Sequence, residues 1–362
     1  MDKTLAAYME DRNNKLINAV IRRIERDCPG AVAMIGIGGS FCNGDFHERS
    51  DLDLMIVIDD EAAWKIAECF VIGEIGFDIY CTPWERLEED AECGTPHLSK
   101  VMDAKIIYCP KEESMARYMA LREKAKAILS APFSAADLQR AEKEYEQAEL
   151  QFSKLTRAGS SVFDCRYYAV VLLYHLEDAL CILNKSYYKM GVKRIFEEFA
   201  AMPNVPENFE DLARALCEAE EPDGMREAAC ALFMAVDQCF RRAKANLPKE
   251  EKPKPSPENI SGTLEEMISN YRGKMWKAIE RNDTHAAFAA LGSLQVFFDE
   301  LHDSLDMPRY DALSGFDPKD LHRSAENYEA AIRAYQAEYE KAGVKLNAFD
   351  TVEAFTEHYL AE

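Results

Sequence analysis

Two aspartates, Asp51 and Asp53, stand two positions apart at the start of the apolar run 54–58. Side chains in a strand alternate between its faces, so this spacing puts both carboxylates on one face. Neighbouring carboxylates repel each other and lose hydration unless a cation compensates them. Because Mg²⁺ accepts carboxylate oxygens together with phosphate oxygens, the pair predicts a magnesium site for phosphoryl chemistry.

A third carboxylate, Asp78, lies between Phe77 and Ile79 in a later apolar run. If the two runs pair, Asp78 joins the face of Asp51 and Asp53; the alternative is an exposed strand residue. Three carboxylates could hold two Mg²⁺ ions ~3.5 to 4 Å apart. One ion would carry a nucleoside triphosphate and the other would activate an attacking hydroxyl group, with Asp78 as a ligand and as the proton acceptor.

A glycine-serine turn precedes the aspartates. Gly39 lets the backbone approach a phosphate closely, and Ser40 offers a hydroxyl group and an N–H at the start of a predicted short helix, where phosphates bind well. Gly44 and Ser50 shape the loop that leads back to Asp51. The plain structural interpretation of this stretch is a turn followed by an edge strand with exposed acids.

The elements that must position these residues form a small α/β unit. Four apolar runs predict strands, at residues 31–37, 52–58, 75–81 and 104–109. Apolar spacing predicts a helix over residues 3–27, and residues 61–70 predict another between the second and third strands. The predicted fold class is therefore α+β, with an N-terminal α/β domain on a small mixed sheet followed by an all-α helical bundle domain.

The remainder of the chain has helical spacing. The predicted divisions are the α/β domain at 1–110, the helical bundle domain at 111–246, a linker at 247–260 and a C-terminal helical segment at 261–362 that packs on the bundle. The linker is predicted from four prolines and several charges in LPKEEKPKPSPE. The segment 161–190 is apolar on nearly every face, which is typical of a central bundle helix.

The composition of the chain limits the partners and the cellular compartment that we expect for this protein. A formal charge of −22 and a pI near 4.8 disfavour nucleic acid and anionic membranes as partners. The 11 cysteines are scattered singly, which indicates reduced thiols in the cytoplasm. No apolar run approaches the ~18 residues of a membrane span, and the N-terminal residues lack a signal core. We therefore expect a cytoplasmic protein.

The stretch Gly39-Ser40, Gly44 and Ser50-Asp51-Leu52-Asp53-Leu54, with Asp78 downstream, resembles the DNA polymerase β-type nucleotidyltransferase superfamily. The branch that it resembles contains the minimal, aminoglycoside and lincosamide nucleotidyltransferases, and the match covers roughly residues 30–82. The resemblance implies that Gly39 and Ser40, with Ser50 in the same loop, bind the triphosphate. It also implies that Asp51, Asp53 and Asp78 hold Mg²⁺.

The sequence departs from this family at Phe41-Cys42-Asn43, where many relatives carry a basic residue. A phosphate contact is then missing or is supplied elsewhere. In the bundle, charged residues between 161 and 194 either pair internally or face a cleft. Glu177 or Asp178 could assist as a base, and Lys185, Lys193 or Arg194 could meet the triphosphate.

The resemblance implies a Mg²⁺-dependent transfer of a nucleoside monophosphate, AMP from ATP as the first expectation, to a hydroxyl group with release of pyrophosphate. The expected acceptor is a small hydroxylated molecule, such as an aminoglycoside-like antibiotic, which an acidic surface would attract. Two alternatives stay open: transfer of AMP to a protein side chain, as in a toxin-antitoxin pair, and a non-catalytic nucleotide-binding or interaction protein.

Overall fold

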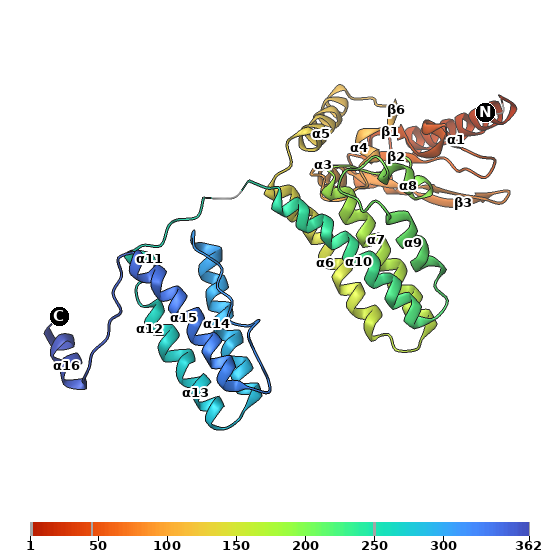
Figure 1. The fold of residues 1–362 in the computed structure, drawn as a ribbon. Helices are drawn as coiled ribbons and strands as arrows, with labels where there is room; N and C mark the ends of the chain where they lie inside the picture. The colour runs from red at the N-terminus through yellow and green to blue at the C-terminus, as the bar shows by residue number, and fades with distance from the viewer. Residues whose placement is uncertain (1–2, 45, 249–250, 362) are drawn as a thin grey trace. The chain divides into compact units, whose positions relative to one another are not determined.

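The computed structural model describes residues 3–44, 46–248 and 251–361, which form two compact units, residues 1–247 and 248–362. Figure 1 shows an α/β part and a helical bundle in the first unit and a second group of helices in the other. The α+β class with a small mixed sheet and a following helical domain is thereby confirmed. Within the described ranges, no helix has both the length and the apolar character that a membrane crossing needs.

The α/β part surrounds a four-stranded sheet in the order β5-β2-β1-β6. β1 is antiparallel to β2 and to β6, whereas β2 and β5 are parallel. The elements are α1 (Lys3–Asp27), β1 (Val32–Ile37), α2 (Gly39–Asn43), β2 (Leu54–Ile58), the 3₁₀ helix η1 (Glu61–Ile66), β3 (Glu68–Ile72), β4 (Ile75–Ile79), β5 (Cys81–Pro83), α3 (Trp84–Ala91), α4 (Ser99–Met102), β6 (Lys105–Tyr108) and α5 (Glu112–Ser130).

Alternation along β2 divides its side chains between two apolar cores. Met55 and Val57 face α3, α4 and α5. Ile56 and Ile58 face α1 and η1. Because both faces are covered, β2 is buried almost along its whole length. Asp53 precedes Met55 by two positions, so the alternation directs its carboxylate toward the side on which α4 lies.

The prediction for residues 61–81 is wrong in two respects. The predicted helix 61–70 is a single 3₁₀ helix followed by strand β3, and the predicted strand 75–81 is divided into β4 and β5. β3 and β4 form a hairpin in which Ile72 pairs with Ile75. Gly73 has a φ of 62°, which suits this two-residue turn, and the rings of Phe70 and Phe77 stack across the strands at 5.3 Å.

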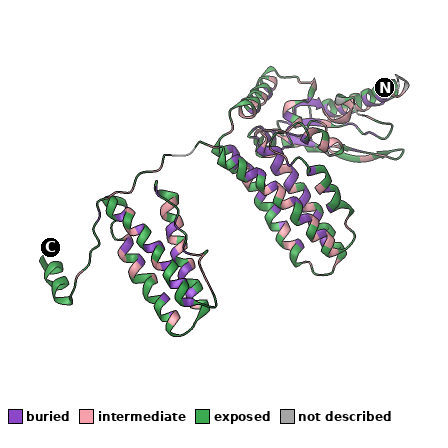
Figure 2. Ribbon diagram, in the orientation of Figure 1, coloured by how far each residue is buried: buried purple, intermediate pink, exposed green. Residues whose placement is uncertain are grey.

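Helices α6 (Ala135–Arg157), α7 (Val162–Leu183), α9 (Phe209–Glu218) and α10 (Pro222–Ala245) form the bundle around one apolar core, with η2 (Val192–Arg194) and α8 (Ile195–Phe199) between α7 and α9. Figure 2 shows the buried residues on the inward faces of these helices. The predicted central helix, α7, packs against α6, α9 and α10. It is not enclosed on every side, because Phe163, Tyr167 and Tyr174 are more than half exposed.

The second unit has its own apolar core, which α12, α14 and α15 share. Its elements are α11 (Pro257–Ile260), α12 (Thr263–Met267), the π-helix η3 (Ile268–Arg272), α13 (Gly273–Glu280), α14 (Thr284–Ser304), α15 (Leu321–Lys341) and α16 (Val352–Ala361). Part of the predicted linker belongs to this unit, since the N–H of Asp306 donates to the carbonyl of Pro253. The packing of residues 261–362 on the bundle stays a prediction.

Candidate active site

The turn after β1 requires a glycine at position 39. Gly39 has a φ of 65°, and a Cβ there would lie 1.6 Å from Oδ2 of Asp53. The N–H of Gly38 donates to the carbonyl of Asp53 (3.0 Å). The glycine turn and the aspartate therefore touch through both backbone and side chain, and any other residue at position 39 would displace the Asp53 carboxylate.

The three predicted carboxylates line one cavity of about 300 Å³, together with Tyr80 and Lys100. Asp51 and Asp53 come from the segment that enters β2, and Asp78 comes from β4. Although β4 has no hydrogen bonds to β2, it packs beside it, because Phe77 shares a small apolar cluster with Leu52 and Ile37. The structure thus brings Asp78 to the cavity by packing rather than by the predicted strand pairing.

The ionised form of Asp53 is destabilised in this arrangement. Its loss of hydration in the hollow, and then the charge of Asp51, raise the pKa of the Asp53 carboxyl group above its ordinary value, although water still reaches it from the cavity. Lys100 and Lys193 act in the opposite direction. The pair Asp51 and Asp53 therefore fits a divalent cation, because a cation removes the repulsion that two bare carboxylates create.

The described residues do not form a preformed metal site with three protein ligands. Among the described residues, no three His, Cys, Asp or Glu side chains lie close enough together to hold a metal ion. Oδ1 of Asp78 accepts a hydrogen bond from the thiol of Cys69 across the hairpin (3.2 Å). The geometry fits two carboxylates that bind Mg²⁺ jointly with substrate phosphates, and Asp78 as a third ligand stays a prediction.

Arg12 of α1 fixes the loop before the aspartates. Its guanidinium group is buried, donates to the carbonyl of Ser50 (2.8 Å), and lies over the ring of Phe77, 5.0 Å from the ring centre. Burial lowers the pKa of Arg12, and the charge of Asp51 counteracts this shift. One side chain thus connects α1, the Asp51 loop and β4, and it holds the segments that carry the acids in register.

The two predicted serines occupy different places. Ser40 lines a second cavity, of about 400 Å³, next to Gly39, Asp51 and Asp53. Ser50 is buried, and its Oγ accepts a hydrogen bond from the N–H of His47 (3.0 Å). In this structure Ser50 closes the loop, and its predicted contact with nucleotide stays a prediction.

Cations reach the second cavity from outside the Gly39 to Asp53 motif. It is lined by His97, from the loop before α4, and by Tyr188, Lys189 and Lys193, from the segment after α7. Lys193 lies close enough to Asp53 to lower the pKa of its carboxyl group. The sequence lacks a basic residue directly after Ser40, but Lys189 and Lys193, from the segment after α7, line the same cavity as Ser40.

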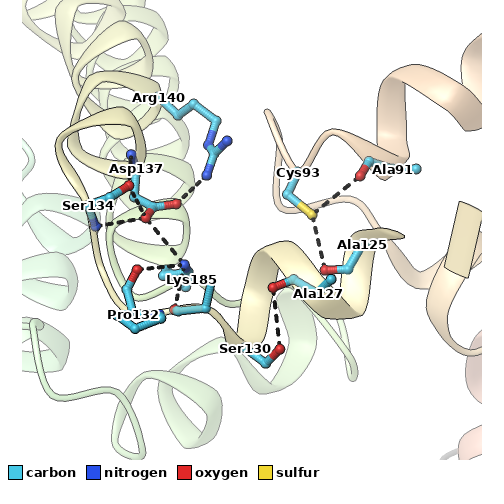
Figure 3. A network of polar contacts seen from close by, with 11 residues as sticks. Ala91, Cys93, Ala125, Ala127, Ser130, Pro132, Ser134, Asp137, Arg140 and Lys185 are labelled. Atoms are coloured by element: carbon cyan, nitrogen blue, oxygen red, sulfur yellow. Dashed lines mark hydrogen bonds and ion pairs between the residues drawn. The ribbon is translucent and has the colours of Figure 1, made fainter. Parts of the chain in front are cut away.

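Other charged residues of the bundle pair internally. Lys185 donates to the carbonyl of Ala131 (2.7 Å) and forms an ion pair with Asp137 (3.2 Å), which also caps α6 and pairs with Arg140 (Figure 3). Lys185 is therefore a structural residue that holds the end of α7 to the start of α6. Arg194 forms an ion pair with Glu197 (2.5 Å).

The acids of α7 also differ from each other. Asp178 accepts a hydrogen bond from Tyr188 Oη (2.8 Å) and lies 3.6 Å from Nε2 of His97. Glu177 is buried in the bundle, and burial, reinforced by the charge of Asp178, raises its pKa to about 8. Neither carboxylate lines the two cavities. Asp178 is one residue removed from the second cavity, behind His97 and Tyr188.

Sequence reasoning missed Arg12, His97, Lys100 and Tyr188. A single signal was present: Arg12 is a charged residue within the apolar spacing of the first helix. The other three have no local signal, because they reach the cavities only through the packing of segments distant in the sequence.

Comparisons with known proteins give one family match, to part of the chain. A solved structure, a nucleotidyltransferase-like protein from Exiguobacterium sibiricum, aligns over 92% of this chain and 96% of its own with 9% identity and a TM-score of 0.33, too low to support an argument. No curated protein matches the chain. The family model described as nucleotidyltransferase domain matches residues 16–129, which contain the C-terminal part of α1, the sheet and the three aspartates. Residues 16–129 therefore match the nucleotidyltransferase domain family, which belongs to the DNA polymerase β-like superfamily.

Proposed function

We propose that this protein is a Mg²⁺-dependent nucleotidyltransferase that moves a nucleoside monophosphate, AMP from ATP as the first candidate, to a hydroxyl group of a small acceptor. The observation that carries the proposal is the contact between Gly39 and Asp53 beside Asp51. It joins a phosphate-type turn to paired carboxylates in one hollow of a domain that matches the nucleotidyltransferase family. Such a hollow suits a triphosphate and a divalent cation together.

The two cavities suggest how the substrates divide. Both are lined by Gly39, Asp51 and Asp53, but only one contains Ser40 and Lys193, and only the other contains Asp78. The triphosphate would lie on the Ser40 side, where the N–H groups of the turn and the Lys193 ammonium group can bind its oxygens. The acceptor would lie on the Asp78 side.

The reaction follows from this division. The acceptor hydroxyl oxygen attacks the α-phosphorus, a new P–O bond forms, and the bond to the β-phosphate oxygen breaks, so that pyrophosphate leaves. Asp78 takes the hydroxyl proton. Mg²⁺, when bound by Asp51 and Asp53, would neutralise their charge and polarise the phosphate oxygens. Lys193 and the N–H groups of the turn would hold the charge that accumulates on the leaving pyrophosphate.

The resemblance to the aminoglycoside and lincosamide branch and the formal charge of −22 both favour a cationic, hydroxylated small molecule as the acceptor. Tyr80, which is half exposed beside Asp78, offers an aromatic surface for such a molecule.

Calorimetric titration tests the proposal before any acceptor is known. Each nucleoside triphosphate is titrated with Mg²⁺ into the wild type and into the double variant Asp51→Asn/Asp53→Asn. We expect one nucleotide to bind the wild type only with Mg²⁺ and the variant at least ~100-fold more weakly, because the loss of both charges removes the cation.

The matched control is Asp11→Asn/Asp303→Asn, which changes the net charge equally through two exposed acids outside both cavities. It should bind as the wild type does. Nucleotide binding that persists without Mg²⁺, or that the Asp51→Asn/Asp53→Asn variant retains, would refute the proposed site. If binding is confirmed, an acceptor screen for pyrophosphate release follows, and an increase in intact mass with MgATP alone would favour a protein side chain as the acceptor.

A further inference from the structure

His97 is held at the mouth of the second cavity by two neighbours from the bundle. Its Nε2 lies 3.6 Å from Oδ2 of Asp178, a distance of an ion pair rather than of a short hydrogen bond. Tyr188 Oη donates to the other oxygen of Asp178 (2.8 Å), and the rings of His97 and Tyr188 are 5.5 Å apart. The N–H of Tyr188 donates to the carbonyl of Pro96 (3.0 Å), so the two loops are also joined through their backbones.

This arrangement orients the imidazole toward the cavity. The His97 side chain is 61% exposed, whereas that of Asp178 is only 24% exposed. Asp178 engages Nε2, and Nδ1 has no hydrogen bond to any described residue. One ring nitrogen is therefore anchored in the protein, and the other remains for a ligand.

The position of His97 distinguishes between the substrates. It lines the cavity that contains Ser40, Lys189 and Lys193, and it does not line the cavity that contains Asp78. By the proposed division, His97 faces the triphosphate rather than the acceptor hydroxyl group. A histidine in this place is suited to bind phosphate oxygens and badly placed to take the acceptor's proton.

The charges around His97 come from several elements. Interaction with Asp178 of α7 is the main reason that the pKa of His97 is raised above its ordinary value; partial burial opposes the rise. On α3, Asp90 supports the protonated form and Arg86 disfavours it. The cavity itself also contains acids and cations, namely Asp51, Asp53, Asp103, Lys189 and Lys193.

We propose that His97, positioned by Asp178 and Tyr188, is a binding residue for the terminal phosphates of the nucleotide, and that it engages them as an imidazolium. This inference rests on the proposed function. His97 then adds a third cation to the contribution of Lys189 and Lys193, and it makes the affinity for a triphosphate dependent on pH. Nucleoside monophosphates, which lack the terminal phosphates, would not use this contact.

The test is titration of a Mg²⁺–nucleoside triphosphate and of the corresponding monophosphate into wild type and His97→Gln, at about pH 6 and about pH 8.5. We expect His97→Gln to bind the triphosphate ~10-fold more weakly than the wild type at the lower pH and nearly equally at the higher pH, because the variant lacks a charged hydrogen bond. Affinity for the monophosphate should not differ between the two proteins. The ratio between the proteins is the readout, since the terminal phosphate itself titrates in this range.

Two further variants separate binding from structure. Asp178→Asn should retain the contact but move the pH at which it is lost to a lower value, since the amide no longer favours the imidazolium. His285→Gln, at an exposed histidine of the second unit, is the matched control and should behave as the wild type does.

The outcomes are distinct. If wild type binds no nucleotide at any pH, the proposed function fails, and this inference fails with it. If wild type binds and His97→Gln shows the same affinity at both pH values, the function stands and the inference is wrong. A variant that binds normally but transfers slowly would also overturn it, because His97 would then act on the acceptor.

Discussion

Glu177 lies on the inner side of α7, and the bundle removes its carboxyl group from water. The side chain is 6% exposed. Burial, with a smaller contribution from Asp178, raises the pKa of Glu177 from 4.5 to about 8. The folded protein therefore keeps this carboxyl group protonated at neutral pH, whereas the unfolded chain does not.

This difference makes the stability depend on pH in a defined direction. Between pH 4.5 and about 8 the folded state binds more protons than the unfolded state, so the free energy of unfolding falls as pH rises. The contribution is complete below the unfolded pKa and is lost once pH passes the folded pKa. At about 1.4 kcal/mol per pH unit, the total loss is about 5 kcal/mol for this one group.

The variant Glu177→Gln keeps the shape of the side chain and removes its titration. Near pH 4.5 it should match the wild type within about 1 kcal/mol, and near pH 8.5 it should be more stable by about 3 to 5 kcal/mol. The assay is urea unfolding at both pH values in a Trp276→Phe background. Trp276 belongs to the second unit, so fluorescence from Trp64 and Trp84 then reports on the unit that contains Glu177.

Glu146→Gln, at an exposed carboxylate of α6, is the control and should leave the difference between the two pH values unchanged. The reasoning is refuted if Glu177→Gln differs from wild type by the same amount at both pH values. It is also refuted if the variant is less stable near pH 8.5, because Glu177 would then have a partner that stabilises its charge.

Three other predictions concern the site and its supports. Gly39→Ala should reduce Mg²⁺-dependent nucleotide affinity by at least ~100-fold in calorimetry. The added Cβ would lie 1.6 Å from an oxygen of Asp53, and the backbone φ at this position is positive. An affinity within about a factor of two of the wild type would contradict this prediction. Arg12→Met should lower the free energy of unfolding of the first unit by about 2 kcal/mol, since the buried carbonyl of Ser50 loses its donor. The same variant should bind nucleotide more weakly. Normal affinity would show that Arg12 does not position the aspartates. Lys185→Met should cost about 2 kcal/mol, because Asp137 and the carbonyl of Ala131 lose a charged donor while Arg140 still pairs with Asp137. Nucleotide affinity should stay unchanged; weakened binding would place Lys185 in the site.

The sequence alone determined the local part of the site. The placement of Asp51 and Asp53 on one face follows from strand alternation, which depends on neighbours within a few residues. The sequence also marked Gly39 as a turn that can approach a phosphate, whereas its close contact with Asp53 is seen only in the structure. The α+β class was also predicted, because apolar periodicity is a local signal. The hairpin formed by β3 and β4 was missed, since residues 61–70 have helical spacing and only cross-strand pairing, Phe70 on Phe77, favours the strands.

Only the tertiary structure decided which distant residues join the aspartates. Asp78 reaches the cavity because Phe77 packs against Leu52, although its strand, β4, pairs with β3 and only the end of the predicted run, at Cys81, pairs with β2. His97 lies in a loop and Lys193 in the short 3₁₀ helix η2, and neither segment has a periodicity that predicts its position. The ion pair between Lys185 and Asp137 has no such local signal either. The local sequence around a charged side chain does not indicate whether that side chain contacts a ligand, an ion-pair partner or solvent. Its role is fixed by the long-range packing that surrounds it, and sequence spacing does not report that packing.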